Sequence, residues 1–301
     1  MLNGIDILNH KGEYLSFLAA IFWAIAIIFF KKSGEKVHPI ALNIFKNSFS
    51  FILFIFTILI MKEELLINLP LRDYIMLMIS GVMGIAIGDT LFFKSLNYLG
   101  AGLSSIVICL YSPFVIVFSI LLLHERLTFL QIIAALLIIS AIFTATSLKN
   151  GNQSVQRHIV KGIILGALSN ASNALGIVMI KPLLNNIPIL FATEVRLLGG
   201  LIALSIILLF MGNRKEIISS LKIREGIIYT ISGSFVGAYL AMMTWISGMK
   251  YTQASIASLL NQTSNVFIFI FAAIFLKEKI NTKRVTGLVM AVIGVIILTL
   301  F

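Results

Sequence analysis

Two basic and two acidic residues lie deep inside long apolar segments of this sequence. Lys46 and Asp89 lie in separate segments, whereas Glu194 and Arg196 share a third one. Ionisable groups at membrane depth are costly and usually functional. These four residues are therefore the first candidates for a site that recognises a charged group or exchanges a proton.

Lys46 and Asp89 are predicted to form an ion pair. Lys46 lies seven residues after Pro39, where its segment begins, and Asp89 lies seven residues before Leu96, near the end of the next segment. At the helical rise, both lie roughly 11 Å from the same side. Contact between opposite charges lowers the cost of burying each. Two interpretations stay open: the pair only orients two helices, or Asp89 exchanges a proton or Lys46 attracts a carboxylate substrate.

Polar side chains recur at three-to-four-residue spacing, which places them on single helix faces. Hydrogen bonds between helices are one explanation. Asn261, Gln262 and Asn265 supply more amide groups than one helix contact requires. We therefore expect this face to border a cavity.

Central aromatic residues complete the predicted cavity, because they suit a partly apolar solute. The predicted substrate-binding residues are Trp23, Lys46, Asp89, Tyr111, Asn173, Arg196, Tyr239, Asn261, Gln262 and Asn265.

The composition excludes a soluble globular domain and a disordered chain. Of 301 residues, 59% are hydrophobic and 12% are charged, against about a quarter charged in soluble proteins. The single cysteine, Cys109, excludes a disulfide framework and a cysteine-based zinc cluster. The net charge of +11 resides in loops between apolar segments, so we expect no nucleic-acid partner.

Ten apolar segments approach the length of about 20 residues that spans a bilayer. They lack the alternation of an outer-membrane barrel. We predict an all-α integral membrane protein whose ten transmembrane helices cover residues 14–30, 39–61, 74–93, 101–123, 128–148, 162–180, 188–211, 226–247, 254–276 and 285–301.

The second half of the sequence repeats the first. The segment HERL at 124–127 precedes the similar KEKI at 277–280 by 153 residues. Each half, 1–149 and 150–301, holds five predicted helices. Five is an odd number, so the halves enter the membrane from opposite sides. Such inverted repeats are typical of secondary transporters, with the substrate site near the midplane between them.

Charge is distributed unequally between the two halves. Arg196 falls 150 residues after Lys46, so the basic position is conserved by the repeat. Asp89 aligns near Ala241, and Glu194 has no acidic counterpart in the first half. Glu194 and Arg196 are two residues apart, so their side chains do not face each other on a helix.

The doubled pattern resembles the EamA family of the drug/metabolite transporter superfamily. The resemblance rests on HERLT (124–128), KEKIN (277–281), AAIFWAI (19–25), Pro113 in the fourth helix and the cation early in the second and seventh helices. The sequence departs from the family at Val266, which stands where Pro113 stands in the first half, and at Lys46, where Arg is common. The resemblance implies ten helices around a central cavity, small organic solutes, often amino acids, and frequent export.

We therefore predict a secondary transporter that moves a small organic metabolite, an amino acid or related solute, by alternating access, with export expected. The alternatives are a carrier of a phosphorylated or sugar-linked solute, given Lys46 and Arg196, and a non-transporting membrane receptor or assembly protein. The histidines lie in loops or at segment ends, and no HExxH, GxSxG or P-loop pattern occurs. We predict no enzyme activity, no cofactor and no metal.

The expected location is the cell (inner) membrane, with several passes. Lys and Arg number six on the N-terminal side of the predicted membrane and fifteen on the other. The positive-inside rule then puts both termini outside, whereas the resemblance suggests both inside. The proton is a candidate coupling ion, and the alternatives of monomer and homodimer stay open.

Two glutamates in the short connections are predicted to be structural rather than substrate-binding. Glu125 and Glu278 each precede a new helix, and a carboxylate near a helix N-terminus is favourable by roughly 0.3–1 kcal/mol. Thr128 and Thr282 are predicted to cap those helices.

Overall fold

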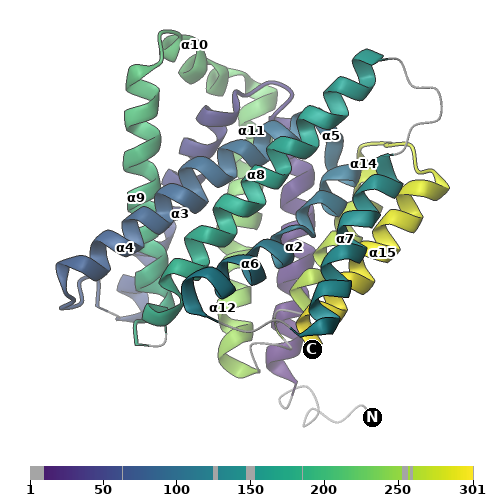
Figure 1. Ribbon diagram of the computed structural model, residues 1–301. Coiled ribbons are helices and arrows are strands. Elements are labelled where there is room, and N and C mark those ends of the chain that lie inside the picture. The colour runs from purple at the N-terminus through teal and green to yellow at the C-terminus, as the bar shows by residue number, and fades with distance from the viewer. Residues whose placement is uncertain are drawn as a thin grey trace, which may run out of the picture.

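The computed structural model describes residues 10–62, 64–124, 128–146, 153–184, 186–252, 257 and 260–300. These residues fold into helices joined by short connections (Figure 1). The predicted role of Glu125 falls outside the described residues.

The first half contains six α-helices and one π-helix among its described residues. They are α2 (Lys11–Ser33), α3 (Pro39–Met61), α4 (Leu71–Gly81), the π-helix η1 (Val82–Asp89), α5 (Thr90–Ile108), α6 (Tyr111–Leu123) and α7 (Phe129–Thr146).

The second half follows a similar order in its described part. Its elements are α8 (Gln153–Leu184), α9 (Ile189–Phe210), α10 (Arg214–Ser219), the 3₁₀ turn η2 (Ser220–Lys222), α11 (Arg224–Gly233), the π-helix η3 (Ser234–Ala241), α12 (Met242–Tyr251), α14 (Ser264–Phe275) and α15 (Thr282–Leu300).

Seven helices in the described part are long and apolar enough to cross a membrane. Two shorter apolar helices, Tyr111–Leu123 and Leu260–Phe275, fall in the predicted fourth and ninth spans. The prediction for residues 39–61 matches α3 at both ends. Residues 71–108 form one helical run instead of ending near residue 93, although Gly100 interrupts it with a φ of 77°.

The predicted fourth and ninth spans are interrupted, which the sequence did not indicate. α5 and α6 are separated by a turn at Cys109 and Leu110, and Thr263 interrupts the helix before α14. At both breaks the backbone N–H bonds the carbonyl three residues back, as in Leu110 to Val107 (3.1 Å) and Thr263 to Leu260 (3.1 Å). Leu110 and Thr263 are 153 residues apart, which is the spacing of the sequence repeat.

The two π-helices also occupy corresponding positions. η1 and η3 are each eight residues long, and η3 begins 152 residues after η1. π-Helices are rare and often mark functional sites. Both lie inside segments that were predicted as continuous α-helix.

The last helices of the two halves pack against each other. α7 and α15 lie side by side at one edge of the bundle (Figure 1). Gly287 and Gly294 let α15 approach α7, because a Cβ at Gly294 would lie 2.6 Å from the Ile138 side chain and 3.0 Å from the Ala134 carbonyl oxygen. Small residues at such crossings permit close helix contact.

The helix caps confirm one predicted residue and correct the other. The Thr128 hydroxyl accepts a hydrogen bond from the Gln131 N–H (3.3 Å), and the Gln131 side chain accepts one from the Thr128 N–H (3.0 Å). The Thr282 prediction is wrong, because α15 begins at Thr282 and its cap is Asn281, whose Oδ1 accepts from the Arg284 N–H at 2.9 Å. Asn281 follows Thr128 by 153 residues.

Glu278 binds a helix N-terminus, but in the other half of the chain. Its carboxylate accepts hydrogen bonds from the backbone N–H groups of Ala101 (2.7 Å) and Gly102 (3.0 Å). These groups are freed where Gly100 adopts its positive φ, a conformation that glycine tolerates best. The structural role predicted for Glu278 agrees with this contact, whereas the helix predicted to receive the carboxylate, the one beginning at residue 282, is not the one it binds.

Glu278→Gln is expected to lower the melting temperature of the protein. An amide presents only one acceptor oxygen, so one of the two backbone N–H groups loses a charge-assisted partner, a loss of about 1–3 kcal/mol. Thermal denaturation in detergent tests this, with Glu216→Gln on the exposed surface of α10 as the matched control. Equal melting temperatures for the two variants would contradict the structural role.

Candidate functional site

A cavity of about 440 Å³ lies between helices of both halves. We call it the central cavity. Aromatic side chains form part of its wall, and polar side chains from α3, η1, α8, α9 and the segment around Thr263 converge on it. Nine of the ten predicted residues line the central cavity: Trp23, Lys46, Asp89, Tyr111, Asn173, Arg196, Asn261, Gln262 and Asn265.

The structure does not bring Tyr239 together with the other nine. Its hydroxyl is hydrogen-bonded to the Thr57 hydroxyl at 2.8 Å. Its ring packs edge-on against Phe54, with 5.6 Å between ring centroids, and Phe54 lines the cavity. Tyr239 therefore joins η3 to α3 and supports the cavity wall from outside.

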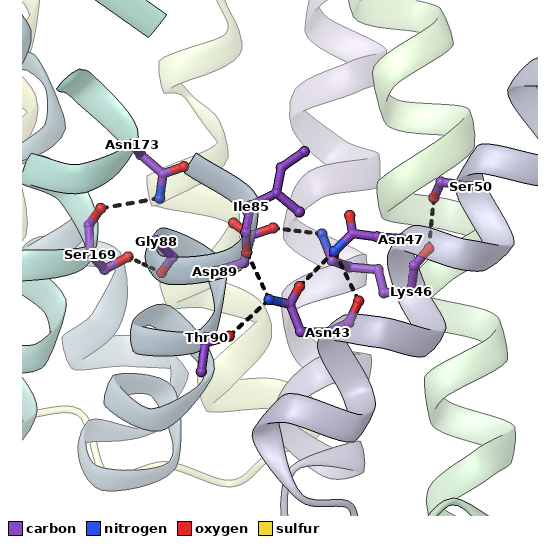
Figure 2. Close-up of polar contacts among 10 residues, drawn as sticks. All are labelled: Asn43, Lys46, Asn47, Ser50, Ile85, Gly88, Asp89, Thr90, Ser169 and Asn173. Atoms are coloured by element: carbon purple, nitrogen blue, oxygen red, sulfur yellow. Dashed lines mark hydrogen bonds and ion pairs between the residues drawn. The ribbon is translucent and has the colours of Figure 1, made fainter. Parts of the chain in front are cut away.

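The predicted ion pair is confirmed. Lys46 Nζ lies 2.8 Å from Asp89 Oδ2, and the two side chains are 12% and 24% exposed (Figure 2). The Phe93 ring centroid lies 5.9 Å from the same ammonium group. Because both charged groups line the cavity, their contact neutralises one side of it.

The π-helix η1 positions Asp89, its last residue. Three side chains from neighbouring helices donate hydrogen bonds to backbone carbonyl oxygens of η1. They are Asn43 to Ile85 (2.7 Å), Ser169 to Gly88 (2.8 Å) and Ser172 to Met83 (2.6 Å). Such donors stabilise irregular helix in a setting without water.

Part of the polar face of α3 therefore has a structural role, because its amides bond to each other and to a neighbouring helix. Asn47 Nδ2 donates to the backbone and side-chain oxygens of Asn43 (2.9 and 2.6 Å), and Asn43 Nδ2 also reaches Thr90 Oγ1 (3.0 Å). Figure 2 shows this chain of amides leading from α3 to the end of η1.

His38 caps the start of α3, where its Nδ1 accepts a hydrogen bond from the Ile40 N–H (3.3 Å). Burial, with the nearby Lys94 charge, lowers the pKa of His38 and so favours the neutral form that can accept.

Arg196 and Glu194 have different surroundings on α9. Arg196 lines the cavity, whereas Glu194 is buried outside the lining. Gly84 makes room for the guanidinium, since a Cβ there would lie 3.3 Å from both Arg196 Nη2 and Asn173 Oδ1. Among the described residues, neither carboxylate oxygen of Glu194 has a hydrogen-bond partner.

Two of the three clustered amides, Gln262 and Asn265, connect the two interrupted helices. Gln262 Nε2 donates to Ser112 Oγ (3.2 Å), and Asn265 Nδ2 donates to Gln262 Oε1 (3.2 Å) and weakly to Cys109 Sγ (3.5 Å). Gln262 and Ser112 lie beside the breaks at 263 and 109–110. These side-chain bonds therefore join the two helices beside the cavity that Asn261, Gln262 and Asn265 line.

Sequence reasoning missed part of the aromatic wall. Phe54, Phe92, Phe93 and Trp245 line the cavity. The signal for Trp245 was its rarity, because the chain contains only two tryptophans and Trp23 was already a candidate. The phenylalanines gave no such signal among 23 of their kind.

Comparison with known proteins identifies one transporter family, and the relatives are also described as transporters. The EamA-like transporter family matches residues 10–147 and again residues 160–300. Two proteins of Archaeoglobus fulgidus, each described as "Uncharacterized transporter", are 26% identical over 286 residues (95% of this chain, 97% of that protein) and 22% identical over 284 residues (93% and 95%). "Uncharacterized transporter YetK" of Bacillus subtilis is 26% identical over 125 residues (42% and 37%).

A solved structure shares the fold. It is described as "Crystal structure of protein" and aligns with a TM-score of 0.57 at 14% identity, covering 95% of this chain and 96% of that one. At this identity the likeness concerns the arrangement of helices alone.

Asp89→Asn and Lys46→Met are each expected to destabilise the protein, by about 1–3 kcal/mol, because each leaves one uncompensated, partly buried charge. The double variant is expected to be milder than the sum of the two, since it leaves no lone charge. Unfolding titrations in mixed micelles measure the free energies.

The matched control for this cycle is Lys215→Met with Glu216→Gln, two exposed residues of α10. Their effects are expected to be small and additive. Additive effects at Lys46 and Asp89 would show that the contact does not couple the two residues.

Proposed function

Since the chain belongs to the EamA-like transporter family and is a multi-pass membrane transporter rather than an enzyme, we propose that it moves a small organic metabolite through the central cavity by alternating access. The observation that carries the proposal is the cavity itself. It is lined by charged, amide and aromatic side chains from both halves of an otherwise apolar bundle. Polar groups are retained at such depth where they face a solute pathway.

We further propose that residues 1–149 and 150–301 are two inverted repeats of five transmembrane helices, giving ten in all. Several features support this proposal. The π-helices, the interrupted helices and the caps Thr128 and Asn281 recur at offsets of 152–153 residues, and the family matches each half separately. In carriers of this kind, interrupted helices border the substrate site between the repeats.

The proposed solute is an amino acid or a related metabolite, moved outward across the cell membrane. A cavity of about 440 Å³ falls within the usual range for small-molecule sites. Its aromatic residues suit an apolar portion of the solute, and its amides suit polar groups. Asp89 is the proposed proton-exchanging residue if transport is coupled to a pH gradient.

The alternatives fit the cavity less well. A phosphorylated solute would need several free cations, but Lys46 is already paired with Asp89. A receptor or assembly protein would be expected to have filled, apolar helix interfaces. The polar lining of the central cavity is an argument against that arrangement.

Transport is expected in proteoliposomes without ATP. A panel of radiolabelled amino acids and metabolites, tested with and without a pH gradient, would identify the solute by saturable counterflow. At matched amounts of folded protein, Asp89→Asn is expected to retain exchange and to lose accumulation driven by the pH gradient.

Protein-free liposomes and the surface variant Arg214→Gln serve as controls. A folded protein that moves no member of a broad panel in either direction would overturn transport through the cavity. Asp89→Asn that accumulates solute as well as the unaltered protein would overturn its role in proton exchange alone.

A further inference from the structure

The second half has a basic residue, Arg196, but no acid at the position that corresponds to Asp89 in the first half. Lys46 corresponds to Arg196, and Asp89 corresponds to Ala241, the last residue of η3 as Asp89 is the last of η1. Lys46 and Asp89 are in contact. Ala241 is fully buried and carries no charge. The two halves therefore share the basic position but not the acidic one.

Arg196 has no ion-pair partner within 4 Å among the described residues. Its Nε is buried and has no hydrogen-bond partner there. A cation held in a cavity without a partner is unfavourable, and this cost falls when an anion binds. Arg196 lines the central cavity, so an anionic solute can reach it.

A second unpartnered donor faces the same cavity. Trp245 lines it, and its Nε1, which can only donate, is buried with no hydrogen-bond partner in the described part of the chain. Arg196 is seven residues from the start of α9, and Trp245 is six residues from the end of α12. These two helix ends lie toward the same end of the bundle (Figure 1). The helical rise puts both residues at a similar depth, about 9–10 Å from those ends.

We infer that Arg196 and Trp245 bind the carboxylate of the transported solute, while Lys46 does not. This inference rests on the proposed function and specifies its substrate class. Lys46 and Asp89 cancel, so Arg196 leaves one positive charge in the lining. One carboxylate is the matching partner for a single guanidinium group, whereas a phosphomonoester, with a charge of about −1.5 to −2 at pH 7, carries more negative charge than Arg196 balances.

Other residues of the cavity lining define the rest of the solute. Asn261 Oδ1 and Asn265 Oδ1 are buried acceptors without partners in the described structure. They complement an N–H or O–H group of the solute. Trp23 and Tyr111 complete an aromatic wall. The solute is thus a monocarboxylate that also carries a hydrogen-bond donor and an apolar portion.

Intrinsic tryptophan fluorescence tests this inference directly. The chain has two tryptophans, and both line the cavity, so emission reports on its occupancy. The probes are apolar amino acids and hydroxy acids, each paired with its uncharged or cationic carboxamide. At least one carboxylate is expected to cause a saturable change, with an affinity about tenfold or more above that of its carboxamide.

The variants separate the two basic residues. Arg196→Gln is expected to weaken carboxylate binding about tenfold or more, and Arg196→Lys to retain part of it, because one charge remains. Trp245→Phe is expected to weaken binding less, with Trp23 as the remaining reporter. In protein that circular dichroism shows to be folded, Lys46→Met combined with Asp89→Asn is expected to weaken carboxylate binding less than Arg196→Gln does, because the pair carries no net charge. Arg214→Gln is the matched surface control.

Three results would overturn the inference: no carboxylate of the panel binds, carboxamides bind as tightly as carboxylates, or Arg196→Gln binds as the unaltered protein does. The proteoliposome assay distinguishes failure of the carboxylate site from failure of the proposed transport function. Transport of a neutral or cationic solute, unaffected by Arg196→Gln, would leave transport standing and remove the carboxylate site.

Discussion

The cost of an unpartnered polar group within an apolar helix bundle is the constraint on which the arrangement of this protein depends. A charge or a freed carbonyl group at this depth is unfavourable unless it finds a partner. Lys46 and Asp89 meet this need for each other at 2.8 Å. The π-helix that ends at Asp89 has carbonyl groups bonded by Asn43, Ser169 and Ser172. Much of the polar surface inside the bundle thus holds irregular backbone in place, and the residues left without partners are the informative ones.

The irregular backbone explains how helices from both halves approach the cavity. Gly84, within η1, lacks the side chain that would press on the Arg196 guanidinium and the Asn173 amide. At Leu110 and Thr263 the helical hydrogen bonding shortens by one residue, beside polar residues that line the cavity. Gln262 and Asn265 then satisfy groups on the facing element. The same residues therefore line the cavity and connect the helices at their breaks.

Hydropathy and depth predicted much of this structure, because both follow from average composition and the regular helical rise. The bounds of α3 and the Lys46–Asp89 contact are examples. The breaks at Leu110 and Thr263 were not predictable, since apolar residues continue through them. The π-helix η1 leaves no periodic signal either, because its carbonyl groups are bonded by side chains such as Ser172 from distant helices. An aromatic ring suits a cavity wall and the layer behind it equally well, so the sequence could not predict that Tyr239 bonds Thr57.

The two halves share their backbone devices and differ in their charges, and these properties serve different requirements. The π-helices and the helix breaks recur at matching positions of the two halves, which suits the alternating access that we propose. Solute recognition needs no such symmetry. At the position that corresponds to Asp89, the second half has the buried and uncharged Ala241. Of the three charged residues in the described part of the lining, Lys46 and Asp89 form an ion pair and Arg196 leaves one positive charge, so the asymmetry of the repeat, rather than either residue alone, favours an anionic group of the solute.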